Sequence, residues 1–186
     1  MTNTIFEGAL AKILDIAKRF SAALDAAGIP YRVVGGMATF IHVDEVDSMA
    51  SRLTRDVDVA IDRSLLDKIR AAVEPHGFIY RHAAGVDMFL PADDPKVRNG
   101  IHIVFLGEKV RPEYLEPIPG SPAERCKYGF LIASVKDLVV MKLTSFRMKD
   151  QVHIQDMDSV GLITPEIEAD LSEPLRQRLA EVRSKE

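Results

Sequence analysis

The chain has 186 residues, a length typical of one domain with enough chain for a sizeable hydrophobic core. Hydrophobic residues make up 47% and charged residues 28%, as in ordinary soluble globular proteins, and the formal net charge of −4 excludes a general attraction to nucleic acid. The single cysteine, Cys126, excludes an internal disulfide and a multi-cysteine zinc site. Neither a signal peptide nor an apolar run near the ~20 residues of a membrane span is visible, so we expect a cytoplasmic protein without a membrane segment.

Helical and strand patterns alternate in the first part of the sequence. Apolar residues recur at three- and four-residue steps over 5–27, which predicts an amphipathic helix that stops at Gly28. Residues 56–61 alternate with a period of two, as in a half-buried strand. The other elements expected here are a strand at 31–34, a helix at 37–43, a polar loop at 44–51, and a helix at 65–74 that Ser64 caps.

Strands and then helices are expected in the rest of the chain. The strands are predicted at 78–82, 86–90 and 101–106, with a hairpin turn at Gly85 between the first two. Glycine and proline are frequent over 107–133, which we interpret as a long surface connection. The helices are predicted at 135–148 after the cap Ser134, at 149–160, and at 165–186 after the cap Thr164, where charges of both signs alternate as on a solvated face.

Two carboxylates and two glycines form the strongest functional signal. Asp56 and Asp58 stand two residues apart on a predicted strand, so both side chains project from one face. That spacing lets both bind one divalent cation, Mg²⁺ or Mn²⁺, because such ions are held by one or two carboxylates together with substrate phosphates. Gly35 and Gly36 lie where a strand ends and a helix begins, so backbone amides there can approach a phosphate.

A structural role is the alternative for the same carboxylates. An Asp-x-Asp pair is commonly a solvated strand edge, and Arg55 and Arg63 are candidates to form ion pairs with it.

The glycine pair followed by Asp-hydrophobic-Asp resembles the signature of the DNA polymerase beta nucleotidyltransferase superfamily. The resemblance implies a mixed β-sheet nucleotidyltransferase fold of the α/β class, flanked by helices. It also implies that Gly35 and Gly36 contact the triphosphate and that Asp56 and Asp58 hold the metal. We expect one such domain over 1–186, with its core at 28–160, an N-terminal helix at 5–27 and a C-terminal helix at 165–186.

A second motif resembles the tail of abortive-infection-type toxin nucleotidyltransferases. Residues 136–143 form an apolar helix with lysines, and 147–156 continue with a Lys-Asp pair and end in aspartate. The resemblance implies that Lys142 and Lys149 neutralise triphosphate charge and that Asp150 positions or activates the acceptor hydroxyl, which suits a reaction that depends on positioning and charge neutralisation. The alternative is a solvated helix end with ordinary surface charges.

The strand at 101–106 departs from the superfamily pattern. Where relatives carry a third acid, this sequence has His102. A neutral imidazole is a poorer Mg²⁺ ligand than a carboxylate, so His102 is either a base for the attacking hydroxyl or a packed strand histidine. Asp87, on the adjacent predicted strand, is either a substitute for the third acid or a hairpin residue.

The expected activity is Mg²⁺-dependent transfer of a nucleoside monophosphate from an NTP to a hydroxyl. The acceptor is a tRNA end, a protein side chain or a small molecule. The alternative is a catalytically inactive descendant that binds a nucleotide or a cognate partner protein, which the toxin resemblance places in a toxin–antitoxin pair.

Overall fold

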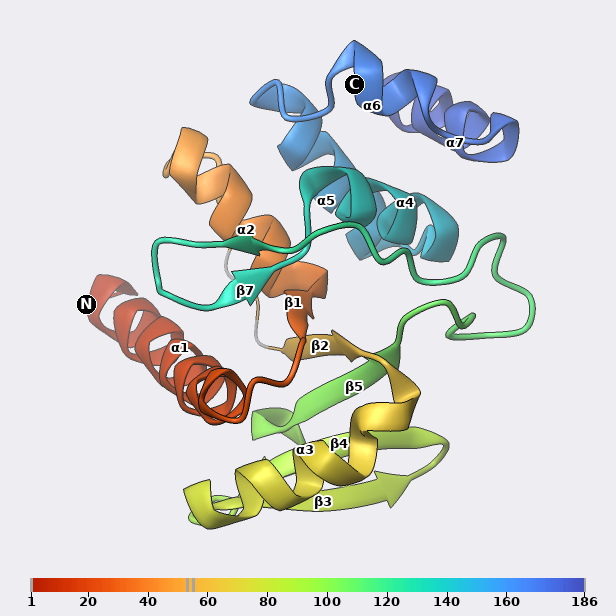
Figure 1. The fold of residues 1–186 in the computed structure, drawn as a ribbon. Helices are drawn as coiled ribbons and strands as arrows, with labels where there is room; N and C mark the ends of the chain where they lie inside the picture. Colours follow the sequence, from red (N-terminus) through yellow and green to blue (C-terminus); the bar gives the residue numbers. More distant parts are fainter. Residues whose placement is uncertain (1, 53, 55, 186) are drawn as a thin grey trace.

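The computed structural model describes residues 2–52, 54 and 56–185, so the ion pair predicted for Arg55 lies outside the described residues. The strands are β1 (Arg32–Val34), β2 (Val57–Ile61), β3 (Phe78–Ala83), β4 (Val86–Pro91), β5 (Ile101–Phe105), β6 (Glu124–Arg125) and β7 (Leu131–Ile132). The described residues form a mixed sheet of seven strands in the order β3-β4-β5-β2-β1-β7-β6 (Figure 1). β2 runs parallel to β5, and β1 runs parallel to β7.

Helices surround this sheet. They are α1 (Thr2–Ala26), α2 (Gly35–Val46), α3 (Leu66–Val73), α4 (Val135–Ser145), α5 (Met148–Ser159), α6 (Pro165–Ala169) and α7 (Glu173–Arg183), with short 3-10 turns η1 (Arg63–Leu65), η2 (Glu74–His76) and η3 (Val97–Asn99). Among the described helices, none combines the length and the apolar character needed to span a lipid bilayer. The expected α/β class, with a mixed sheet flanked by helices, is confirmed.

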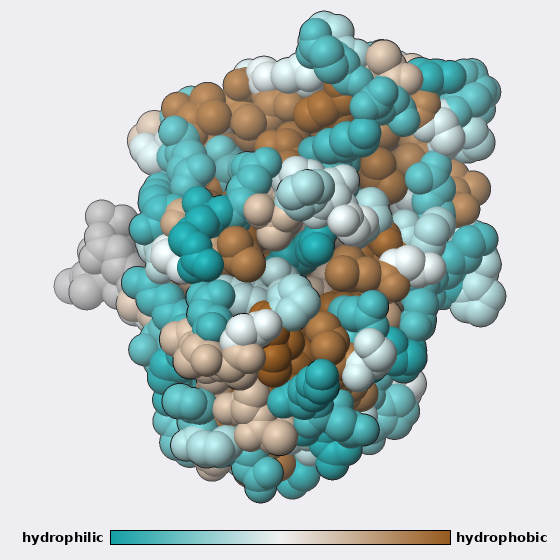
Figure 2. Space-filling model, viewed as in Figure 1, coloured by the Kyte–Doolittle hydropathy of each residue, from teal (hydrophilic) through white to brown (hydrophobic). Residues whose placement is uncertain are grey.

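The two faces of the sheet are covered by different helices. On one face, the ring of Phe20 from α1 packs 5.3 Å from the rings of Phe78 and Phe89, and α1 packs against α3. Figure 1 shows α3 beside β3 and β4 at one end of the molecule, and α4 to α7 at the other end. Hydrophobic and hydrophilic residues are interspersed over the face seen in that view (Figure 2), as on an ordinary water-exposed surface.

The register of the central strands sets the position of the polar residues. Val34 on β1 pairs with Asp58 on β2, and Asp58 pairs with His102 on β5. Directly paired residues project from the same face of a sheet. The end of β1, the acid on β2 and the histidine on β5 therefore lie in one row.

The segment 107–133 is more than a surface connection. It contains β6 and β7, and Ile132 pairs with Val33, which extends the sheet beyond β1. A strand of two residues has too little periodicity to be predicted, because its partner defines it.

The C-terminal region also differs from the single helix predicted at 165–186. The chain breaks between α6 and α7. Helix α7 begins at Glu173, after the N-cap residue Ser172, and has Pro174 in its first turn, where proline is favoured. The cap predicted at Ser64 also differs. The side chain of Asp62 caps the turn η1, which precedes α3, because it accepts a hydrogen bond of 2.8 Å from the backbone amide of Ser64.

The arginines of α7 do not form the solvated face that the sequence predicted. Arg178 donates to the carbonyl oxygens of Leu143 and Thr144 at 2.7 and 2.8 Å, and Arg183 pairs with Asp158 and Glu168. A cation on the last carbonyls of α4 satisfies groups that a helix end leaves unpaired. Helix α7 is therefore fastened to α4 and α5.

Candidate active site

The glycine pair forms the junction between β1 and α2. Gly35 has φ +68°, in the left-handed region, and a Cβ atom there would overlap Oδ2 of Asp58. The position thus requires glycine for its backbone angle and for space. Gly36 follows as the second residue of α2, where a Cβ would lie 2.6 Å from Oγ1 of Thr54. The amide end of α2 therefore opens beside Asp58.

Asp56 and Asp58 lie at the start of the central strand β2, on the face turned toward α2. The side chain of Asp58 is 31% exposed, and Nδ1 of His102 lies 3.5 Å from its Oδ1. The hydrogen bond to Asp58 raises the pKa of His102 above 6.5, although burial opposes the shift. Both carboxylates keep oxygen atoms that face the cavity described below.

This donor set fits part of a Mg²⁺ shell. Two carboxylates on one face suit a hard cation, with phosphate and water oxygens to complete its octahedron. The described residues contain no group of three or more His, Cys, Asp and Glu side chains that could hold a metal by themselves.

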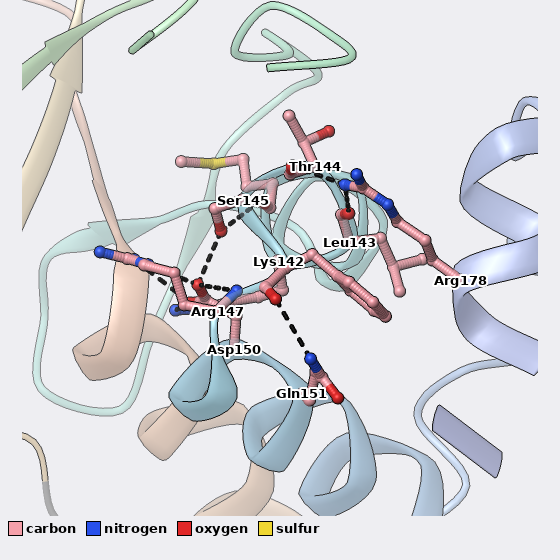
Figure 3. A network of polar contacts seen from close by, with 10 residues as sticks. Lys142, Leu143, Thr144, Ser145, Arg147, Asp150, Gln151 and Arg178 are labelled. Atoms are coloured by element: carbon pink, nitrogen blue, oxygen red, sulfur yellow. Dashed lines mark hydrogen bonds and ion pairs between the residues drawn. The ribbon is translucent and has the colours of Figure 1, made fainter. Parts of the chain in front are cut away.

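A second polar cluster lies at the turn between α4 and α5 (Figure 3). At its centre, the carboxylate of Asp150 is fully buried and accepts five hydrogen bonds, from Lys142, Ser145 and Arg147. Burial raises the pKa of Asp150, but these hydrogen bonds and charges outweigh it and hold the pKa at about 2. Burial also lowers the pKa of Lys142, and the charge of Asp150 opposes that shift.

A cavity of about 510 Å³ joins the two clusters. We call its two sides the acidic wall, formed by Asp56 and Asp58, and the basic wall, formed by Lys142, Arg147 and Lys149. The predicted residues that line the cavity are Gly35, Gly36, Asp56, Asp58, Lys142, Lys149 and Asp150. His102 is not among the lining residues and contacts the site through Asp58.

A third side of the cavity, a strap over residues 107–118, was not predicted from the sequence. The two ends of the strap are held together, because Gly107 donates to the Ile118 carbonyl and Ile118 donates to the Glu108 carbonyl, both at 2.9 Å. Val110, Tyr114 and Ile118 of the strap line the cavity. Arg111 and Glu116 of the strap also line the cavity, so this side offers apolar, aromatic and charged groups.

His153 on α5 is a further lining residue that the sequence did not single out. Its Cε1 atom would lie 3.5 Å from a Cβ on Gly36, and its buried Nδ1 has no hydrogen-bond partner among the described residues. Burial and the nearby charge of Lys142 lower the pKa of His153 to about 4. The imidazole is therefore neutral at pH 7.

Two roles that the sequence left open are wrong: Asp87 as a substitute for the third acid, and Arg63 as an ion-pair partner of the two carboxylates. Asp87 pairs with Ile103, one residue out of step with His102, so it projects from the opposite face of the sheet and cannot replace the third acid. There it accepts hydrogen bonds from Tyr80 and His82 at 2.5 and 2.8 Å.

Arg63 does not pair with Asp56 or Asp58. Its guanidinium group binds Glu108 through two hydrogen bonds of 2.7 and 2.6 Å and lies over the ring of Phe105.

Solved structures share this architecture. The sequence matches no protein-family model and no curated protein. A nucleotidyltransferase-like protein of Paracoccidioides brasiliensis is 17% identical, with a TM-score of 0.58 over 94% of this chain and 88% of that one. The antibiotic-resistance factor ANT(2'')-Ia is 14% identical, with a TM-score of 0.55 over 92% of this chain and 91% of that one.

The chain has the nucleotidyltransferase fold. Within that fold, the cavity lies at the junction of β1 and α2, beside the start of β2. The residues predicted to act on metal and phosphate are thus brought together, even though they come from segments about a hundred residues apart in the sequence.

Proposed function

We propose that this protein is a Mg²⁺-dependent nucleotidyltransferase that moves a nucleoside monophosphate from an NTP to a hydroxyl group. The observation that carries the proposal is a single cavity lined both by the carboxylates of the acidic wall and by the cations of the basic wall. A metal–triphosphate complex has the matching charges, because the metal is positive and the phosphates are negative.

Each group of cavity-lining residues has its own role in the proposed reaction. Asp56 and Asp58 hold the cation, which when bound neutralises charge on the phosphates and polarises the α-phosphorus. The amides of Gly35 and Gly36 approach the phosphates at the start of α2. Lys142 and Lys149 supply positive charge from the basic wall. The strap accommodates a nucleobase or the acceptor.

In the reaction, the acceptor oxygen bonds to the α-phosphorus and the bond from that phosphorus to the pyrophosphate oxygen breaks. The hydroxyl proton needs an acceptor. Asp150 is the poorer of the two sequence-based candidates, because its buried carboxylate already accepts five hydrogen bonds and has a pKa of about 2. His102 is the remaining candidate, and it contacts the site through Asp58.

A second candidate function is nucleotide binding without transfer. It is favoured by the histidine in place of the third acid and by the absence, among the described residues, of a three-ligand metal group. The narrower assignment to a cytoplasmic toxin of a toxin–antitoxin pair, with its cognate partner protein, draws support only from the sequence resemblance at Lys142, Lys149 and Asp150.

The deciding experiment is a transfer assay with each α-labelled NTP, Mg²⁺ and fractionated cell extract as the source of RNA, protein and small-molecule acceptors. We expect one labelled fraction that depends on Mg²⁺ and disappears with Asp58→Asn. If Mg²⁺–NTP binds in calorimetry but no fraction is labelled, the binding function stands and the transfer function fails.

A further inference from the structure

Arg147 occupies a distinctive place at the cavity, and the sequence assigned it no role. It precedes the first residue of α5 and lines the cavity with a side chain that is 52% exposed. Its Nε and Nη2 atoms bond the two oxygens of Asp150 at 2.7 and 3.3 Å. No described residue bonds its Nη1 atom. One edge of the guanidinium is thus fixed while the other is available to a ligand.

We propose that Arg147 is a triphosphate-binding residue and that Asp150 is the positioning residue that fixes Arg147 and Lys142 on the basic wall. The proposal rests on the proposed function and assigns Asp150 a role other than activation of the acceptor.

The contacts of Asp150 leave no place for a substrate hydroxyl. Oδ1 accepts from Lys142 at 3.1 Å and from Arg147, while Oδ2 accepts from Ser145 at 2.8 Å and from the Arg147 amide and Nε. The side chain is 0% exposed. A carboxylate whose oxygens are all engaged behaves as an anchor, and burying it without its partners would be costly.

The charge of Asp58 on the acidic wall favours the charged forms of both Arg147 and Lys142. Asp150 raises the pKa of Arg147 most strongly, burial opposes this, and Tyr114 and Asp58 add smaller contributions in the same direction as Asp150. Asp58 likewise favours the charged form of Lys142, although burial lowers its pKa overall. The two cations and Asp58 therefore line one cavity and influence one another's charge, as expected of groups that share one metal–triphosphate complex. A guanidinium with one free edge suits a phosphate group, which it can bind through two hydrogen bonds.

The turn that carries Arg147 is itself held in place. Phe146 adopts φ +51°, and its carbonyl accepts from Gln151 at 3.1 Å. Arg178 bonds the carbonyls that precede the turn (Figure 3). Lys149, by contrast, is exposed and forms no ion pair with a described residue. Arg147 is therefore held in place before a ligand binds, whereas Lys149 has no ion pair with a described residue to hold it.

Calorimetry of Mg²⁺–NTP and of inorganic tripolyphosphate tests the assignment on wild type, Arg147→Met, Asp150→Asn and the double variant. We expect each single variant to weaken binding about tenfold or more, as for lost hydrogen bonds to charged groups. The double variant should be no more than about twofold weaker than the worse single variant, because both changes disable one unit. Millimolar guanidinium should partly restore binding to Arg147→Ala, an effect that general loss of structure would not give.

Kinetics separate positioning from acceptor activation. A positioning role for Asp150 raises the KM for NTP in Asp150→Asn, and Arg147→Lys should recover part of the loss in Arg147→Met. If Asp150→Asn binds tripolyphosphate normally and lowers kcat alone, Asp150 activates the acceptor and the proposal is overturned. Normal binding by Arg147→Met also overturns it.

A control and a comparison complete the design. Lys136→Met, the control, removes an exposed ion pair with Asp170 and should leave binding unchanged. Lys149→Met removes the exposed cation of the basic wall and should weaken binding less than Arg147→Met does. Should Asp150→Asn fail to fold, the Arg147 variants and their rescue decide the matter alone. If wild type binds tripolyphosphate but transfers nothing, the proposed function fails and this inference stands; if wild type binds neither ligand, both fail.

Discussion

Asp58 on β2 and Asp150 on α5 line the same cavity, but their surroundings differ. Asp58 is 31% exposed and has His102 as a neighbour at 3.5 Å. Asp150 is fully buried and accepts five hydrogen bonds from three residues. A carboxylate with accessible oxygens can bind a cation, whereas a fully bonded one can only hold protein groups in place. Residue type alone therefore does not decide the role of an acid at a site.

The largest expected effect comes from Asp58→Asn. Loss of the metal-binding charge should lower transfer at least about 100-fold, as when one strong electrostatic group is removed from an active site. Stability should change little, because Asp58 and Asp56 repel each other without a cation. Label transfer and thermal melts check this, with the exposed Asp67→Asn as control. A strongly destabilised Asp58→Asn would mean that Asp58 is structural like Asp150.

Gly35→Ala should be the most damaging change to the fold near Asp58. The left-handed backbone angle costs a residue with a Cβ about 1–2 kcal/mol, and overlap with the Asp58 carboxylate adds to this. Gly28→Ala is the matched control, because Gly28 has φ +65° but nothing within 4 Å of a new Cβ. Urea unfolding should show a larger loss for Gly35→Ala than for Gly28→Ala. Equal losses would show that Asp58 moves aside freely.

Protonation of Asp150 should lower the unfolding free energy of the protein at acidic pH. Its pKa is about 2 in the folded state and near 3.8 when unfolded, so its contribution is complete above pH 4 and is lost as the pH falls from about 4 to about 2. The shift corresponds to about 2–3 kcal/mol. Over this range, the unfolding free energy should fall less steeply with decreasing pH in Asp150→Asn than in wild type. Parallel curves would contradict the hydrogen bonding described for Asp150.

Asp87→Asn should give the smallest of the expected effects. Asp87 extends the comparison to a carboxylate on the other face of the sheet. Burial raises the pKa of Asp87, but hydrogen bonds from Tyr80 and His82 outweigh it, so the pKa is lowered. We expect a loss of about 1–2 kcal/mol in unfolding free energy and unchanged NTP binding, because Asp87 faces away from the cavity. Weaker NTP binding in calorimetry would show that the two faces of the sheet are coupled.

Much of the site was predictable because its signals are local. The two-residue spacing of Asp56 and Asp58 fixes their common face, and the glycine pair marks the end of a strand. The bonding of Asp150 was not predictable, because it depends on how the turn after α4 brings Arg147 and Lys142 to one carboxylate.

The fold likewise has elements that were predictable from local sequence and elements that depend on distant partners. Long periodic segments such as α1 were predicted to within three residues at each end, whereas β7, a strand of two residues, is defined by its pairing with β1. Asp87 was ambiguous for a related reason, since the register between β4 and β5 decides its face and leaves no trace in local sequence. The break before α7 did have a signal, Pro174, because the residue before a proline is disfavoured in a helix.

The two walls of the cavity come from opposite halves of the chain. The acidic wall and the glycine pair are complete by residue 61, but the basic wall begins only at α4, and β1 receives its outer neighbour β7 from residues 131–132. During synthesis, the chain emerges from its N-terminus and such distant contacts form late. A nascent chain that stops before residue 130 therefore carries both carboxylates without the cations of the basic wall. On the proposed function, nucleotide binding needs both walls, so an interrupted product that lacks the basic wall should not bind NTP.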